Sequence, residues 1–219
     1  MSSLLFGEIV EPSTRALIED EFDEFPEYTK PSLDYEGDFS VPAAIHSMIF
    51  IETKKIRTVF TTCMLEHLTP MCTIKNAEIE VYNFGKYKYM IVFGQPQELI
   101  VHYFHDWIIK AESIFGITSD SSGNYQTMDA RSKPPSIIRK LSSNSTDFNI
   151  PNLEPPNLIT GLGANVLSYC IHLGLNNCCL FVVYFDSSPL DSLSVGPLIE
   201  LSRKLELPLR KSNIQVGTL

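Results

Sequence analysis

The sequence lacks several features that mark whole classes of protein. No apolar run approaches the roughly 18 residues that a membrane-spanning helix needs. The five cysteines are odd in number and irregularly spaced, which favours reduced thiols over a disulfide framework. No basic region followed by a long apolar stretch opens the chain, so no secretory signal peptide is expected. Together these absences predict a protein of the cytoplasm, with the nucleus as a further compartment.

An excess of basic charge is also missing. The chain has 26 acidic and 17 basic residues, for a formal net charge of −9. Residues 1–40 contain 11 of the acidic and two of the basic residues, whereas residues 41–219 contain 15 of each. Nucleic acids and anionic membranes attract basic surfaces, because phosphates must be neutralised. The charge therefore argues against both partners and indicates a neutral body behind an acidic N-terminal arm.

Motifs for catalysis and metal binding are scarce. No Gly-x-Ser-x-Gly pentapeptide occurs, and the cysteines lie mostly in apolar runs, where burial would raise the thiol pKa. His102 and His105 have i, i+3 spacing, but no acidic or thiol ligand lies near them at a known metal-site spacing, so solvated histidines are favoured. We therefore assign no catalytic residue, metal ligand or cofactor, and expect a protein that is not an enzyme.

The segment Gly161-Leu162-Gly163 leaves one alternative open. Glycine-rich turns before a helix can bind phosphate groups through backbone N–H groups. However, Val166 stands where a dinucleotide fingerprint requires a third glycine, and no P-loop lysine follows. A plain helix-entry turn is favoured, and a small-molecule-binding α/β enzyme that uses this turn is the alternative function.

The spacing of apolar residues predicts strands and helices along the body. The predicted strands are 45–51, 77–84, 87–93 and 178–185, with a weak polar strand at 125–128. The predicted helices are 54–68, 97–115, 163–173 and 191–207, the last interrupted at Gly196-Pro197. Residues 178–185 are apolar on both faces, which is typical of a central strand covered on both sides. This pattern predicts a single-domain α/β sandwich with a mixed sheet flanked by helices.

Composition divides the chain into three parts. Residues 1–42 are expected to form an acidic, largely disordered arm, because acids and prolines bury too little surface to offset chain entropy. Residues 43–207 are expected to form the α/β body, and residues 208–219 a C-terminal tail. Within the body, the Pro/Ser-rich segment 129–157 is expected to be a mobile loop with one helical turn at 136–141.

Several segments resemble the proteasome assembly chaperone 1 family. Phe6-Gly-Glu-Ile-Val10, followed by an acidic arm, is similar to the start of that family. Leu153-Glu-Pro-Pro-Asn-Leu-Ile159 leads into Ala164-Asn-Val-Leu-Ser-Tyr-Cys170, as a Leu-Glu-x-Pro-Asn segment leads into such a helix in the family. Ser136–Arg139 resembles a loop segment of the family, and Ala111–Gly116 resembles the end of its long helix. The segments occur in the same order as in the family.

The resemblance implies a function that composition does not indicate. Members of the family have an α/β sandwich fold and no catalytic residue or cofactor. They pair with proteasome assembly chaperone 2 as a heterodimer. The heterodimer binds the outer face of the α-ring of the 20S proteasome, guides its assembly and prevents off-pathway association of rings. The expected partners are therefore this second chaperone and the α-subunits.

The C-terminal tail is where the resemblance implies the binding residues. In the family a hydrophobic–Tyr–x tail inserts between neighbouring α-subunits, and its terminal carboxylate pairs with a lysine. Here Asn213 and Ile214 match the approach to that motif, but Gln215 stands in the place of tyrosine and Thr218 is the penultimate residue. The candidate partner-binding residues of the tail are Asn213, Ile214 and Leu219, together with Arg210 and Lys211, whose basic charge suits an acidic partner surface.

Overall fold

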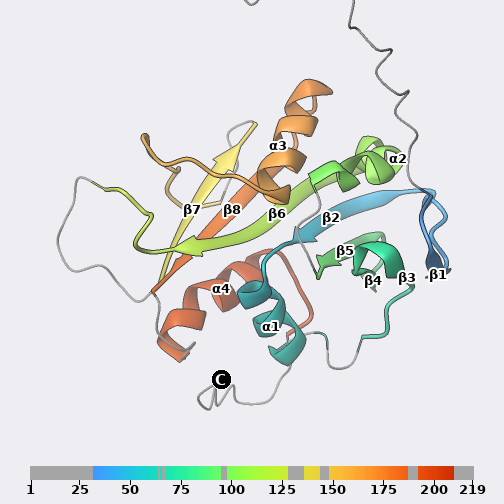
Figure 1. The fold of residues 1–219 in the computed structure, drawn as a ribbon, viewed down its shortest axis with the longest axis horizontal. Helices are drawn as coiled ribbons and strands as arrows, with labels where there is room; N and C mark the ends of the chain where they lie inside the picture. Colours follow the sequence, from blue (N-terminus) through green and yellow to red (C-terminus); the bar gives the residue numbers. More distant parts are fainter. Residues whose placement is uncertain are drawn as a thin grey trace, which may run out of the picture. The chain divides into compact units, whose positions relative to one another are not determined.

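A computed structural model gives the structure of the chain and describes residues 32–63, 65, 68–94, 98–127, 136–143, 148–186 and 192–209. The strands are β1 (Tyr35–Gly37), β2 (Ile45–Ile51), β3 (Cys72–Ile74), β4 (Ile79–Gly85), β5 (Lys88–Phe93), β6 (Ala111–Ser121), β7 (Ser136–Ser142) and β8 (Cys178–Phe185). The α-helices are α1 (Lys54–Cys63), α2 (His105–Lys110), α3 (Leu162–His172) and α4 (Ser192–Lys204). Two short 3-10 helices, η3 (Lys75–Ala77) and η4 (Glu98–Phe104), complete the described elements (Figure 1). No helix in these ranges is long and apolar enough to cross a membrane.

The strands form one mixed sheet in the order β1-β3-β4-β5-β2-β6-β8-β7. Its centre is parallel, because β2 runs parallel to both β5 and β6, and β6 runs parallel to β8. The remaining neighbours pair antiparallel, including β4 with β5, which match the predicted strands 77–84 and 87–93, and β7 with β8 at the edge. The predicted α/β fold with a mixed sheet is confirmed.

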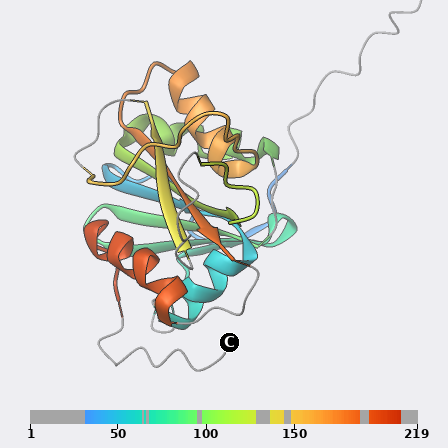
Figure 2. The same ribbon diagram turned by 90° about the vertical axis from the view of Figure 1, so that its left-hand side faces the viewer.

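Helices cover both faces of the sheet (Figures 1 and 2). Alternate residues of β2 point to opposite faces. Ile49 and Ile51 join a core with α1 and α4, whereas Met48 and Phe50 join a core with η4, α2 and α3. All eight residues of β8 are buried, as predicted for a central strand covered on both sides. The carboxyl ends of the parallel strands β5, β2, β6 and β8 therefore lie side by side, between the two helical layers.

The predicted helix 97–115 is wrong over its last five residues. The helical part ends at Lys110, and Ala111 begins the long strand β6. Gly116, expected to end the helix, lies inside β6, where an added Cβ would lie 2.8 Å from Leu180 Cδ1. Because β6 lies between β2 and β8 and carries apolar residues on both faces, its pattern does not distinguish a strand from a helix.

Other predicted elements also need correction. Residues 136–142 form strand β7, paired with β8, and not a helical turn within a mobile loop. Helix α4 continues through Gly196-Pro197. Helix α1 ends at Cys63 and not at 68, and residues 125–127 form no strand. In β7 the pairing with β8 decided the structure, since its own six-residue pattern also suits a helical turn.

The folded body begins before the expected boundary at residue 43. Strand β1 pairs with β3, and the Phe39 ring stacks on Trp107 with 5.8 Å between ring centroids. Leu33, Phe39 and Val41 pack against the core on the α2–α3 face. Acids and prolines around these apolar residues concealed them from an interpretation based on composition. Residues 1–31 lie outside the described ranges, so the expectation for that part of the arm remains a prediction.

Candidate interaction surface

The turn Gly161–Gly163 is closed by a carboxylate of the chain itself. Glu52 follows β2 directly and is only 6% exposed. The backbone N–H groups of Leu162 and Gly163 donate to its Oε1 and Oε2, at 2.9 and 3.0 Å. A negative charge at a helix N-terminus is stabilised by the helix dipole and by the unpaired N–H groups of the first turn. The place where a phosphate would bind is therefore filled by Glu52.

The two glycines of this turn allow close approach of the backbone to its neighbours. Gly161 has φ +91°, and a Cβ there would lie 2.7 Å from Glu52 Oε1. A Cβ on Gly163 would lie 2.7 Å from Leu180 Cδ1. Their role is thus explained by intramolecular packing. Sequence reasoning missed Glu52, which is 110 residues from Leu162 and stands in no motif.

The residues that carry the family resemblance fix the approach to α3. The side chain of Asn157 donates to the carbonyls of Gln126 and Glu154, both at 2.8 Å, and accepts from the Gln126 N–H at 2.8 Å. Leu153 packs with Tyr125 and with β8 in a small core cluster. The Leu-Glu-Pro-Pro-Asn segment is therefore a fastened connection to α3.

A buried tyrosine joins this segment to β7. The Tyr125 hydroxyl donates to Glu154 at 2.6 Å and accepts from Arg139 Nε at 2.8 Å. Burial raises the pKa of Tyr125, and its hydrogen bond holds the pKa of Glu154 below its usual range. Burial also raises the pKa of the neighbouring Tyr184 to about 12. The Tyr125 hydroxyl therefore ties the segment before α3 to β7 through Glu154 and Arg139.

The outer side of α3 carries no charged side chain other than the ionisable His172. Ile171 is 56% exposed on this helix, and Leu158 is 86% exposed in the segment before it. His105 Nδ1 lies 2.7 Å from the Tyr169 hydroxyl, and the His102 ring meets the Tyr169 ring edge-on. Within the described ranges no group of three or more potential ligands could hold a metal ion. The surface formed by α3 and the segment before it is therefore weakly charged and carries two exposed apolar side chains.

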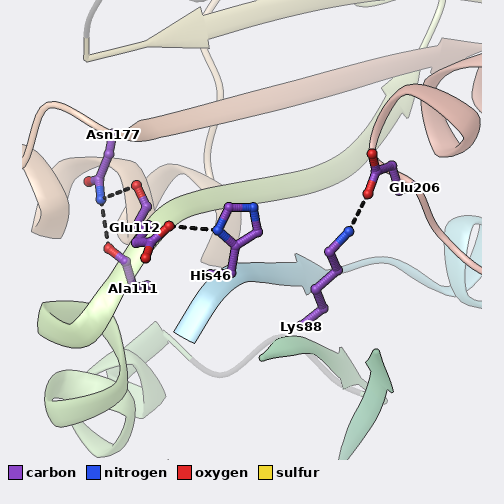
Figure 3. Close-up of polar contacts among 6 residues, drawn as sticks. All are labelled: His46, Lys88, Ala111, Glu112, Asn177 and Glu206. Atoms are coloured by element: carbon purple, nitrogen blue, oxygen red, sulfur yellow. Dashed lines mark hydrogen bonds and ion pairs between the residues drawn. The ribbon is translucent and has the colours of Figure 1, made fainter. Parts of the chain in front are cut away.

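A second polar cluster lies at the amino ends of the parallel strands, opposite to the carboxyl ends where Glu52 lies (Figure 3). His46 Nδ1 lies 2.6 Å from Glu112 Oε2, and both side chains are more than half exposed. Asn177 donates to the carbonyls of Ala111 and Glu112. Across the same edge Lys88 pairs with Glu206, and this contact lowers the pKa of Glu206. The cluster links the starts of four strands to the end of α4.

The predicted partner-binding residues lie outside the described residues. These are Arg210, Lys211, Asn213, Ile214 and Leu219. The described chain ends at Leu209, after Leu205 and Leu207 have packed into the core beside α4. The role of the tail therefore remains a prediction.

The described cysteine side chains are buried and form no disulfide with one another, as expected for small apolar residues; they are those of Cys72, Cys170, Cys178 and Cys179. Burial raises the pKa of Cys72. The hydrogen bond with Cys170 and burial together raise the pKa of Cys178. The thiols of Cys72 and Cys178, whose pKa is raised, are therefore poor nucleophiles at neutral pH.

Comparisons with known proteins identify the fold. The sequence matches no protein-family model and no curated protein. Among solved structures, a protein of unknown function from Thermoplasma acidophilum has a TM-score of 0.56 and 10% identity, over 78% of this chain and 80% of that chain. One from Corynebacterium glutamicum has a TM-score of 0.56 and 12% identity, over 80% and 83%. Pyrococcus furiosus PbaA, an archaeal homolog of proteasome-assembly chaperone, has a TM-score of 0.49 and 10% identity, over 82% and 88%. The first two likenesses show the fold alone, and the third is too weak to support an inference.

Proposed function

We propose that this protein is a proteasome assembly chaperone that acts through protein–protein contacts. The observation that carries the proposal is the resemblance of residues 153–170 to the chaperone family. In the structure these residues act as one unit, because Leu153, Glu154 and Asn157 fasten the chain that enters α3. Leu153, Glu154 and Asn157 belong to the segment that resembles the family, so the resemblance includes the residues that hold the entry to α3 in place.

The finer part of the proposal concerns the partners. We propose a heterodimer with proteasome assembly chaperone 2 that contacts α-subunits of the 20S proteasome. The absence of Asp, Glu, Lys and Arg from α3 supports a protein partner on this side, since charged residues are depleted at the centre of interfaces. No described feature favours the alternative of a small-molecule-binding enzyme, and Glu52 fills the turn on which that alternative depends.

Co-expression with proteasome assembly chaperone 2, followed by size-exclusion chromatography, tests the heterodimer. We expect co-elution of the two chains at a single ratio, and recovery of α-subunits when they are supplied. A well-behaved monomer with affinity for neither partner would refute the proposal. Phosphate or nucleotide binding by the wild-type chain that is lost on substitution of Gly161 would favour the enzyme.

A truncation addresses the tail separately. Removing residues 214–219 should weaken binding to the α-ring if the terminal carboxylate docks there. The arginine and lysine at 210 and 211 remain in this variant, so it separates the carboxylate and the apolar end from the basic charge. Unchanged affinity would assign the contact to the body or to the basic residues that remain in the tail.

A further inference from the structure

Two thiols lie against each other where α3 packs beside β8 (Figure 1). Cys170 is in the last turn of α3, and Cys178 is the first residue of β8. Both side chains belong to the core cluster on the α2–α3 face, and their thiol groups form a hydrogen bond with one another. Two thiols in direct contact are the arrangement from which a disulfide forms.

The other two described cysteines lie elsewhere in the fold. Cys179 follows Cys178 directly, but successive residues of a strand point to opposite faces, and Cys179 packs in the core on the face covered by α1 and α4. Cys72 lies in β3, and the four strands β4, β5, β2 and β6 stand between β3 and β8. The fold therefore directs Cys170 toward Cys178 in particular.

The hydrogen bond makes the two thiols chemically unequal. Donation from the Cys178 thiol stabilises the Cys170 thiolate and lowers the pKa of Cys170, although burial opposes this shift. The same hydrogen bond and burial raise the pKa of Cys178. Because the thiolate is the nucleophilic form of cysteine, Cys170 is the sulfur that attacks an oxidant first, and Cys178 is in place to react with the product.

A short surface connection joins the two cysteines and controls access to them. Residues 173–177 link α3 to β8, and Gly174 among them is exposed. The Leu175 N–H donates to the Cys170 carbonyl at 2.9 Å, and the Gly174 N–H donates to the Ile171 carbonyl at 3.0 Å. Surface connections open locally at a lower free-energy cost than the strands of a core. A small oxidant therefore reaches the buried thiols when this connection opens, without unfolding of the body.

We propose that Cys170 and Cys178 form a redox-sensitive pair, which a hydroperoxide converts to a disulfide that ties the end of α3 to β8. The Cys170 thiolate attacks the peroxide, so that an S–O bond forms and the O–O bond breaks. The products are a sulfenic acid on Cys170 and an alcohol or water, which takes up the proton that Cys170 lost. The Cys178 sulfur then attacks Cys170, the S–S bond forms, and the hydroxyl group leaves as water with the Cys178 proton. The two sulfurs lose two electrons in total, and the two peroxide oxygens gain them.

Disulfide mapping of the folded full-length chain tests the pair. Hydrogen peroxide is added, the remaining thiols are labelled with N-ethylmaleimide, and the peptides are analysed by mass spectrometry. We expect Cys170 to be linked to Cys178, with the maleimide label on Cys179. The link should persist in Cys179→Ala and disappear in Cys178→Ala, which are matched variants because the two cysteines are adjacent and buried in β8. No link between Cys170 and Cys178 in the folded wild type, or a link from Cys170 to Cys179, would overturn the proposal.

Hydrogen exchange tests whether the disulfide ties α3 to β8. The amides of Gly174 and Leu175 should exchange about 10-fold or more slowly in the oxidised protein, because a cross-link from residue 170 to residue 178 restricts opening of the connection between them. Reduction with dithiothreitol should restore the original rates. The amides of β4, on the far side of β2, are the internal control and should not change. Equal exchange at Gly174 and Leu175 in the oxidised and reduced proteins would overturn the proposed effect of the disulfide on α3.

Discussion

The two ends of the parallel strands use the same type of residue in opposite ways. At the carboxyl end Glu52 is 6% exposed, and two backbone N–H groups bind its carboxylate. At the amino end Glu112 has a side chain that is 68% exposed and faces His46. Water competes for Glu112 but hardly reaches Glu52, so the carboxylate at the carboxyl end is worth far more to the fold.

The two ends of the parallel strands also differ in how firmly their polar contacts hold the chain. The carboxyl end holds the turn that begins α3 in one arrangement, which fixes the segment bearing Leu158. The amino end connects the strand starts to the last helix through exposed pairs that can be remade with water. We therefore expect substitutions at the two ends to differ in size and in their response to salt.

The largest effect should come from Glu52→Ala. The change leaves two buried N–H groups without a charged acceptor and should lower the free energy of unfolding by about 3 kcal/mol. Glu112→Ala is the matched control and should change it by less than about 0.5 kcal/mol. Urea denaturation of both variants measures the difference. Equal losses would show that burial does not distinguish the two carboxylates.

The next effect should come from Gly161→Ala. Its φ of +91° and the collision of the new Cβ with Glu52 both oppose the substitution. Gly174→Ala is the control, because Gly174 also has a positive φ, of +72°, but nothing lies within 4 Å of an added Cβ. The control should cost about 1 kcal/mol from backbone strain, and Gly161→Ala should cost clearly more. If thermal unfolding gives the same loss for both, the close approach to Glu52 contributes nothing.

A smaller effect is expected from the Lys88–Glu206 pair at the amino end. Lys88→Gln, Glu206→Gln and the double variant form a cycle that isolates the coupling between the two charges. Because the Glu206 side chain is 72% exposed, the coupling should be weak at low salt and vanish at high salt. A coupling that persists in high salt would show that this edge is as well protected as the opposite one.

The smallest effect concerns acid pH. The pKa of Glu206 is lowered from its ordinary value of 4.5, chiefly by the hydrogen bond from Lys88. A lowered pKa in the folded state means that the stabilisation is present above pH 4.5 and is lost as pH falls through the folded value. Glu206→Gln should therefore slightly flatten the decline of stability as pH falls below 4.5, measured by urea midpoints. An identical decline in both proteins would contradict this assignment.

Short apolar runs with a clear period could be predicted from the sequence. Strands β2 and β8 appear as predicted, because a short continuous apolar run between polar residues is a local signal. Helix α3 also appears as predicted, because an apolar segment between two glycines is a local signal too. The first five residues of strand β6 were predicted as the end of a helix, because Ala111, Ile114 and Phe115 continue the helical spacing of the apolar residues before them. Strand β7 was also missed, because its partner β8 follows 36 residues later.

For the candidate site, too, some features could be predicted from the sequence and others could not. The resemblance around residues 153–170 could be recognised from side chains alone, and so could the neutral body behind an acidic arm. Only the structure shows that Asn157 binds the backbone of Gln126 and that Glu52 closes the Gly161 turn. It also shows that Leu158 is exposed.

The sequence by itself determined the α/β class, the buried central strand and the separation of charge along the chain, because these depend on composition and on neighbouring residues. Only the tertiary structure decided that the carboxylate of Glu52 binds the first turn of α3 and that Leu158 is exposed to solvent. Glu52 and Leu162 are 110 residues apart and meet only because β2 and α3 are placed together by the sheet. Contacts of that range depend on the packing of whole elements, and no local pattern of residues specifies them.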